Sequence, residues 1–233
     1  MRNSDVLLNH LSKLPDNLEG LQQATAEIYK QNLFLTAKFL LDYRDITNFT
    51  HGNVIRTLES DTPRKLIVMP RGTFKSSIAS VSYPIWKLLR NPNERILIDS
   101  EIYSNSKNFL REIKTHLCND KLVDLFGEFK TRSCWNEGEI IIKQRTQNYK
   151  EASITCSGIG AGKTSQHYST IIADDLNGPS NSLTTEGRQK VIEHYRYYTS
   201  LLEPGGTLVI VGTRYAADDI IGTVIQNEIR GVA

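Results

Sequence analysis

The feature that most constrains the fold of this chain is a short apolar segment that ends in a turn and leads into a predicted helix. The apolar run 65–69 is followed by the turn-forming residues 70–72, which indicates a buried strand and then a turn. A helical pattern begins at Lys75 and extends to about residue 89. In this arrangement the backbone N–H groups of the turn and of the helix N-terminus can face phosphate groups. The sequence therefore predicts a phosphate-binding loop over residues 69–76.

The last two residues of this loop indicate its chemistry. In phosphate-binding loops a lysine reaches the terminal phosphates and the following Ser or Thr hydroxyl binds magnesium. Lys75 and Ser76 occupy these places, although Met69 and Phe74 replace the two glycines of the usual G-x-x-x-x-G-K-[ST] pattern. The alternative is that Lys75 is a solvated lysine in a first helical turn, where the helix dipole disfavours it unless an anion binds.

A second segment, 157–164, ends in Gly-Lys-Thr and competes for the same role. A phosphate-loop helix needs roughly ten residues before the chain can return as another strand. The strand predicted over 170–173 follows Thr164 too closely for that. We therefore predict that Lys75, and not Lys163, contacts phosphate. The glycine-rich segment is then a turn between two strands near the nucleotide, or a loop without a chemical role.

Two carboxylates, Asp174 and Asp175, follow the apolar run 169–173. In P-loop ATPases the first acid after such a strand holds magnesium, and the second orients or deprotonates the attacking water. Many ATPases of the additional-strand group carry glutamate at the second place, so Asp175 has a shorter reach. The alternative reading is an Asx turn at the end of a strand.

A further apolar strand is predicted over 207–211 and ends in Gly212-Thr213-Arg214. A threonine at the end of a strand beside the acidic strand can sense the γ-phosphate, which is the role predicted for Thr213. Arg214 is predicted to stabilise charge on the transferring phosphoryl group, with a plain surface arginine as the alternative.

Strand patterns alternate with helical patterns, which predicts an α/β fold with a mainly parallel central sheet covered by helices on both faces. The predicted strands are 65–69, 95–99, 139–143, 152–156, 170–173 and 206–211. The predicted helices are 18–43, 75–89, 104–117, 184–201 and 218–229, and Pro84 should bend or divide the second. Residues 1–60 are predicted to be a helical lead-in, and residues 61–233 the P-loop core.

Composition excludes several classes of protein. The apolar stretches are far shorter than the roughly 20 residues of a membrane span, and the N-terminus lacks the apolar region of a secretory signal. Scattered cysteines indicate reduced thiols and neither a disulfide framework nor a zinc site; they are Cys118, Cys134 and Cys156. The net charge of +2 does not indicate a polyanionic partner, so a DNA-binding face would have to be local.

Together these motifs resemble the ATPase domain of the large terminase subunit of tailed bacteriophages, the motor that pumps DNA into capsids. The resemblance runs from about residue 34 to 229. It rests on the segments 69–77, 82–100, 157–179 and 200–222. It implies a P-loop NTPase of the additional-strand, RecA-like kind that uses ATP and Mg²⁺, and it places Arg71 in the nucleotide site.

The motifs and the resemblance together define the expected site. The expected nucleotide-binding residues are Pro70, Arg71, Gly72, Thr73, Phe74, Lys75, Ser76, Ser77, Thr213 and Arg214. The expected catalytic residues are Arg71, Lys75 and Asp175, and the expected magnesium-binding residues are Ser76 and Asp174.

The resemblance also implies an adenine-contacting segment between residues 31 and 50, with Phe34 and Tyr43 as candidates. Motors of this family act as rings, usually of five subunits, in which an arginine of one subunit completes its neighbour's site. The candidate donors are Arg145, Lys163 and Arg188. The helix over 184–201 is either a DNA-contacting face or an ordinary solvated face; its candidate contacts are Arg188, Lys190, Arg196, Tyr197 and Tyr198.

The expected function is therefore ATP-driven translocation of double-stranded DNA into a procapsid. The expected partners are the DNA, a portal protein, a small terminase subunit and further copies of this chain, in the cytoplasm of a host and with no membrane. Large terminases continue into an RNase-H-like nuclease domain, for which no second α/β pattern remains before Ala233, so no nuclease activity is expected from these residues. Two alternatives stay open: a helicase-like ATPase with a second RecA-like domain, and a nucleotide-binding module without turnover.

Overall fold

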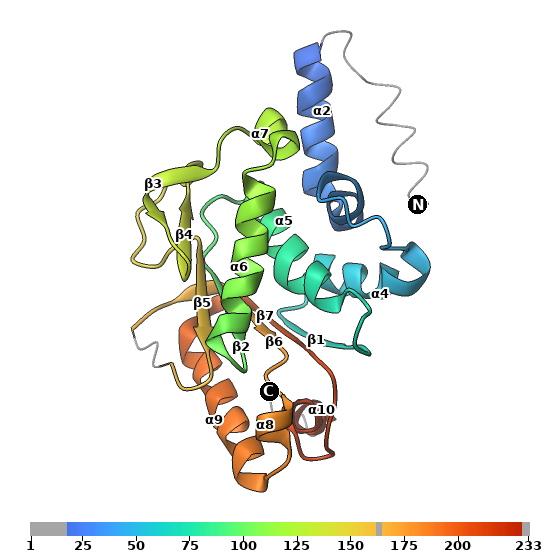
Figure 1. Cartoon of the computed structure of the whole chain (residues 1–233), viewed down its shortest axis with the longest axis vertical. Helices are drawn as coiled ribbons and strands as arrows, with labels where there is room; N and C mark the ends of the chain where they lie inside the picture. Colours follow the sequence, from blue (N-terminus) through green and yellow to red (C-terminus); the bar gives the residue numbers. More distant parts are fainter. Residues whose placement is uncertain (1–17, 162–164, 230–233) are drawn as a thin grey trace.

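The computed structural model describes residues 18–161 and 165–229, and a seven-stranded sheet forms its centre (Figure 1). The strand order is β1-β7-β6-β2-β5-β4-β3. The strands are β1 Arg64–Val68, β2 Ile96–Ser100, β3 Lys130–Trp135, β4 Glu139–Ile142, β5 Ile154–Gly158, β6 Tyr168–Asp174 and β7 Leu202–Gly212. Strands β1, β7, β6, β2 and β5 run parallel, and β4 and β3 extend the sheet in antiparallel fashion. The predicted α/β class with a mainly parallel sheet is confirmed.

Helices before, between and after the strands cover both faces of the sheet. Those on the N-terminal side and between the first strands are α2 Leu18–Gln31, α3 Leu33–Leu35, α4 Asn48–Glu59, α5 Tyr83–Arg90, α6 Tyr103–Leu117 and α7 Asp120–Phe126. Those after β6 are α8 Pro179–Ser182, α9 Thr185–Leu201 and α10 Ile220–Ile229. Two segments are π-helical, η1 Thr36–Leu40 and η2 Ser77–Ser82.

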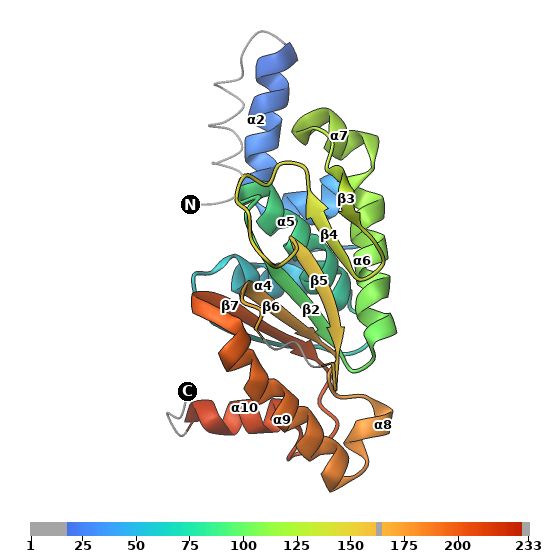
Figure 2. The ribbon, with the colours of Figure 1, turned by 90° about the vertical axis from the view of Figure 1, so that its left-hand side faces the viewer.

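Alternate residues of the central strands belong to two separate hydrophobic cores. In β2, Ile96 and Ile98 pack with α4, α5 and α6, whereas Leu97 packs with α9. The same alternation in β7 directs Val209 to the first core and Ile210 to the second. Figure 2 shows α6 and α9 on opposite sides of these strands. Burial on both faces explains why the strands read as continuous apolar runs.

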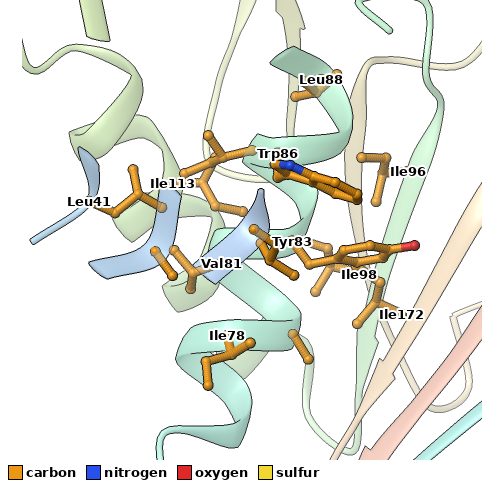
Figure 3. Close-up of a cluster of buried hydrophobic side chains, with 14 of the residues drawn as sticks. Leu41, Ile78, Val81, Tyr83, Trp86, Leu88, Ile96, Ile98, Ile113 and Ile172 are labelled. Atoms are coloured by element: carbon orange, nitrogen blue, oxygen red, sulfur yellow. The ribbon is translucent and has the colours of Figure 1, made fainter. Parts of the chain in front are cut away.

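The first core is filled by large side chains of η2 and α5 that lie against β2 and β6 (Figure 3). The rings of Tyr83 and Trp86 are stacked, with centroids 6.0 Å apart. Tyr83 lies near Ile98 and Ile172 of the sheet (Figure 3). This packing fixes the helix that follows β1 firmly on the sheet.

The parallel register brings the carboxyl ends of the strands to one edge of the sheet. Val68 pairs with Gly212, Asp174 pairs with Val211, and Ser100 pairs with Asp174. Ligands of open parallel sheets bind outside this edge. The turn after β1 and the acids at the end of β6 therefore lie at the same end of the molecule.

Two helical predictions need correction. The helix predicted over 18–43 is interrupted, because the Asn32 side chain accepts a 2.9 Å hydrogen bond from the Leu35 N–H and caps a new helix start. Helix α4 was not predicted, although Thr47 caps it and its buried residues Val54, Ile55 and Leu58 have helical spacing.

Pro84 was predicted to bend or divide its helix, and the structure shows a continuous helix that changes from π to α just before Pro84. The residues immediately before it form the π-helix η2, and α5 continues beyond. Proline has no N–H to donate and crowds the preceding turn, so a wider turn accommodates it. The Ser82 hydroxyl donates to the Ser77 carbonyl at 2.9 Å within this turn.

Within residues 18–161 and 165–229, none of the helices combines the length and the apolar character needed to cross a bilayer.

Candidate functional site

The turn predicted to bind phosphate lies between β1 and a helix that begins at Lys75. The Thr73 hydroxyl donates to the Pro70 carbonyl at 2.7 Å and closes the turn. Gly72 has a φ of +76°, the left-handed conformation that glycine adopts without a steric penalty. The backbone of residues 69–76 thus forms a compact, strongly curved turn at a helix N-terminus.

Phe74, at the place of the second pattern glycine, is also left-handed, with a φ of +55°. This conformation is unfavourable for a bulky residue, so neighbouring contacts must hold it. The Phe74 ring meets the buried His51 ring of α4 edge-on, with centroids 6.1 Å apart. The Phe74 carbonyl also accepts the Ile78 N–H at 2.9 Å. Phe74 therefore adopts the left-handed backbone conformation that glycine usually adopts at this place of the loop.

The Lys75 side chain is 6% exposed and lies across the site from Asp175. Its Nζ is 3.8 Å from Asp175 Oδ2, a long ion pair. Among the residues that the structure describes, no acceptor lies within hydrogen-bonding distance of this ammonium. A buried cation with a single distant partner can accept an additional anion.

Asp174 is almost completely buried and receives two hydroxyl hydrogen bonds. Ser76 Oγ donates to Oδ1 at 3.0 Å, and Ser80 Oγ donates to Oδ2. The pKa of Asp174 is raised to about 6, chiefly by burial and secondarily by the charge of Asp175, while the Ser80, Ser76 and Lys75 groups act against the rise. The buried carboxylate therefore lacks a cation strong enough to hold its pKa at the ordinary value. Sequence reasoning missed Ser80.

The donor set fits magnesium. Ser76 and Asp174 offer hydroxyl and carboxylate oxygens side by side, and Mg²⁺ prefers oxygen ligands. In the described part of the chain no cluster of three or more His, Cys, Asp or Glu side chains is arranged to hold a metal. Mg²⁺ commonly binds one or two protein oxygens and takes its other ligands from water and phosphates.

Asp175 also has a left-handed backbone, with a φ of +45°. Its N–H donates to the Val211 carbonyl of β7 at 2.8 Å, which fixes the chain as it leaves β6. Its Oδ1 is buried without a hydrogen-bond partner among the described residues. That oxygen lies over Gly212, 3.5 Å from the place where a β-carbon would stand.

The strand end at β7 is attached to the turn after β1. The Met69 N–H donates to the Gly212 carbonyl at 3.3 Å, and the Thr213 hydroxyl donates to the Met69 carbonyl at 3.2 Å. Thr213 thus touches the beginning of the phosphate-binding turn. These two hydrogen bonds join the turn to the segment after β7.

Arg71 extends from the turn to the same segment. Its guanidinium donates to the Tyr215 hydroxyl and lies 5.7 Å from the centre of the Tyr215 ring. Tyr215 is itself fixed, because its N–H donates to the buried Asp219 carboxylate at 2.9 Å. Arg71 is therefore held at the edge of the site.

Arg214, predicted to stabilise charge on the phosphoryl group, is engaged in its own loop. Its guanidinium donates to the carbonyls of Ala216 and Ala217, at 3.2 and 3.3 Å, and so supports its own loop. Ser77 is half-buried in η2, and Pro70 is exposed at the start of the turn.

The two adenine candidates have polar and cation–π partners outside the turn. The Tyr43 hydroxyl bonds to Glu112 and lies 3.2 Å from His116, both on α6. The Phe34 ring has the Lys38 ammonium 5.8 Å above it. An aromatic residue upstream of the turn, His51, contacts the turn through the Phe74 ring.

Of the candidate donors to a neighbouring subunit, two are engaged within their own chain. Arg145 donates to the Glu151 carbonyl at 2.8 Å, and Arg188 bonds to Asp218 at 3.0 Å. Lys163 lies outside the described residues. Tyr198 is 1% exposed and bonds to Asp99, so its assignment as a DNA contact is wrong.

Comparison with models of protein families and with curated proteins finds no match. Among solved structures, the chain is similar to the crystal structure of the HK97 bacteriophage large terminase, with a TM-score of 0.60 and 11% sequence identity. The similarity covers 87% of this chain and 41% of that one. The chain therefore has the fold of a part of that terminase. At this identity the likeness concerns the fold alone.

Proposed function

We propose that this chain is the ATP-hydrolysing motor domain of a viral large terminase subunit, which drives double-stranded DNA into a procapsid. The observation that carries the proposal is the meeting of Ser76 and Asp174 at 3.0 Å beside Lys75 and Asp175. Hydroxyl, ammonium and two carboxylates at a helix N-terminus are the set of groups that phosphoryl transfer from a nucleoside triphosphate needs. The fold similarity to a phage terminase supports the choice of the motor class.

In the proposed reaction the turn 69–76 binds the phosphates through its N–H groups, and the buried Lys75 ammonium binds the terminal phosphate oxygens. Ser76 and Asp174 would hold Mg²⁺, which would offset charge on the phosphates. Asp175 orients a water molecule whose oxygen attacks the γ-phosphorus, while the bond to the β–γ bridging oxygen breaks. ADP and phosphate leave, and the proton of the water passes to Asp175 or to solvent.

Thr213 and Arg71 connect the turn to the segment after β7, so loss of the γ-phosphate can change that segment. We propose that this change is coupled to DNA movement in a ring of about five subunits docked on a portal protein, with a small terminase subunit as a further partner. A basic group of a neighbouring subunit would complete each site, in the cytoplasm of the host.

The experiment is phosphate release by the wild-type chain and by Lys75→Ala and Asp175→Asn. Both variants should lose nearly all activity, whereas Lys143→Ala, an exposed lysine paired with Glu128, should keep it. Wild-type activity in either site variant would refute the assignment. A low basal rate would not, because an arginine supplied by a neighbour contributes about 10³ to 10⁵ in rate in analogous enzymes.

Two further measurements distinguish the alternatives. Stimulation by double-stranded DNA, greater than that by single-stranded DNA, supports a packaging motor over a helicase-like enzyme. Tight ATP binding with no turnover, even with DNA and portal present, would identify a nucleotide-binding module instead.

A further inference from the structure

A buried amide without any partner lies two residues after Asp175. Asn177 is 4% exposed, and neither its Oδ1 nor its Nδ2 has a hydrogen-bond partner among the described residues. Burying an amide without giving it a hydrogen-bond partner has a large free-energy cost. Such a group in a folded protein requires an explanation.

The surrounding segment is not loosely built. The Asn181 amide uses both of its ends: Nδ2 donates to the Leu176 carbonyl at 2.7 Å, and Oδ1 accepts the Gly178 N–H at 2.8 Å. The Ser182 hydroxyl donates to the Gly178 carbonyl at 2.6 Å. A well-ordered frame therefore holds Asn177, and its unpaired amide is not a consequence of disorder in its neighbours.

A second unpaired oxygen lies close by in the chain. Asp175 Oδ1 is buried without a partner in the described part of the chain. Since each residue spans at most about 3.6 Å, the α-carbons of Asp175 and Asn177 are no more than about 7 Å apart. A carboxylate offers only acceptors, whereas an amide offers both a donor and an acceptor. Together they match the needs of one water molecule, which donates two hydrogen bonds and accepts others.

We propose that Asn177 is a water-holding residue of the site, whose amide and the Asp175 carboxylate together bind the water that attacks the γ-phosphorus. This inference rests on the proposed function. It also offsets the short reach of Asp175, because a water held from two sides does not depend on one carboxylate for its position. The proton of the attacking water still passes to Asp175 or solvent.

The test replaces the amide by an apolar group of similar size. Asn177→Leu should lower kcat for ATP hydrolysis by about tenfold or more while KM changes by less than about twofold, because the water and not the nucleotide loses its contact. The same variant should keep or raise Tm, by about 2 °C, because an unpaired buried amide has been removed. Asn181→Leu is the matched control and should lower Tm, because its amide bonds the backbone.

Wild-type kcat in Asn177→Leu would overturn the inference, and so would a fall in Tm like that of Asn181→Leu, which would make the amide structural. A crystal structure of the wild-type chain gives an independent readout. An ordered water within hydrogen-bonding distance of both Asn177 and Asp175 supports the inference, and its absence overturns it. Should that water be present in a wild-type protein that hydrolyses no ATP, the proposed function would fail while the water site would stand.

Discussion

The Ser76 hydroxyl donates a 3.0 Å hydrogen bond to Asp174, a residue 98 positions later in the chain. Ser76 lies in the helix start that follows β1, Asp174 is the last residue of β6, and β7 lies between these two strands in the sheet. The order and register of the strands therefore bring the turn after β1 within hydrogen-bonding distance of the acid at the end of β6.

The stability of the protein should depend on the ionisation of Asp174. Its pKa is raised from the ordinary 3.8 to about 6, chiefly by burial, so the folded state binds more protons than the unfolded state between these values. The contribution of Asp174 to the free energy of unfolding is fully present below about pH 4. It is lost as the pH rises through about 6, and the total loss is roughly 3 kcal/mol. Asp174→Asn should gain stability relative to wild type over this range. Urea unfolding at pH 4, 5, 6 and 7 measures the difference, and parallel pH profiles of the two proteins would contradict the prediction.

Ser80 should tune the affinity of the metal site. Ser80→Ala removes a hydrogen bond to a buried carboxylate, which contributes about 1.5 to 3 kcal/mol. We expect lower stability, and a higher Mg²⁺ concentration for half-maximal ATP hydrolysis, because the orientation of Asp174 is lost. Ser82→Ala is the matched control, since Ser82 is buried in the same π-helix but bonds only a backbone carbonyl. An equal shift of the Mg²⁺ requirement in both variants would contradict the assignment.

The Tyr215 hydroxyl should matter to activity through Arg71. Tyr215→Phe keeps the ring under the guanidinium but removes the acceptor, so Arg71 is oriented less well. We expect kcat/KM for ATP to fall by about tenfold, the effect of one hydrogen bond to a charged group. Tyr103→Phe is the control, because Tyr103 is an exposed tyrosine with the Lys107 ammonium 5.4 Å above its ring. Unchanged kinetics of Tyr215→Phe would show that this contact has no functional role.

Asp99 should contribute to stability and not to chemistry. Its Oδ2 lies 2.6 Å from His194 Nε2 and accepts the Tyr198 hydroxyl at 2.9 Å, and the carboxylate is 1% exposed. Asp99→Ala leaves the buried Tyr198 hydroxyl and the partly buried His194 ring, both on α9, without this partner, which costs about 3 kcal/mol. The midpoint of urea unfolding should fall accordingly, whereas Glu137→Ala, an exposed carboxylate paired with Lys107, should leave it unchanged. A midpoint for Asp99→Ala equal to that of wild type would refute this role.

The strand–turn–helix unit at Lys75 and the acids after β6 could be predicted because each is a local pattern. An apolar run, a turn and a helix start are read from adjacent residues, and the parallel topology then brings strand ends together. Ser80 could not be identified in this way, because a serine inside a helix has no distinctive sequence signal. Its position four residues after Ser76 does place both on one helix face, and that spacing was available.

Neither helix α4 nor the orientation of Arg214 could be predicted from the sequence, and the two reasons differ. The weakly amphipathic α4 contains Gly52 and several polar residues, so only its Thr47 cap and three apolar positions indicated a helix. Arg214 bonds carbonyls of its own loop, a choice made by the local path of the backbone after β7. An arginine at the end of a strand gives the same sequence pattern whether its side chain faces a phosphate or its own loop.

Both halves of the site are attached to consecutive peptide groups of β7. The turn leading to Lys75 bonds the Gly212 carbonyl, and Asp175 bonds the Val211 carbonyl. A displacement of β7 therefore acts on both halves of the site together, because each half is hydrogen-bonded to it. A backbone rotation at Gly212, which lies between those two carbonyls, would move one half relative to the other, and glycine permits such a rotation more readily than any other residue.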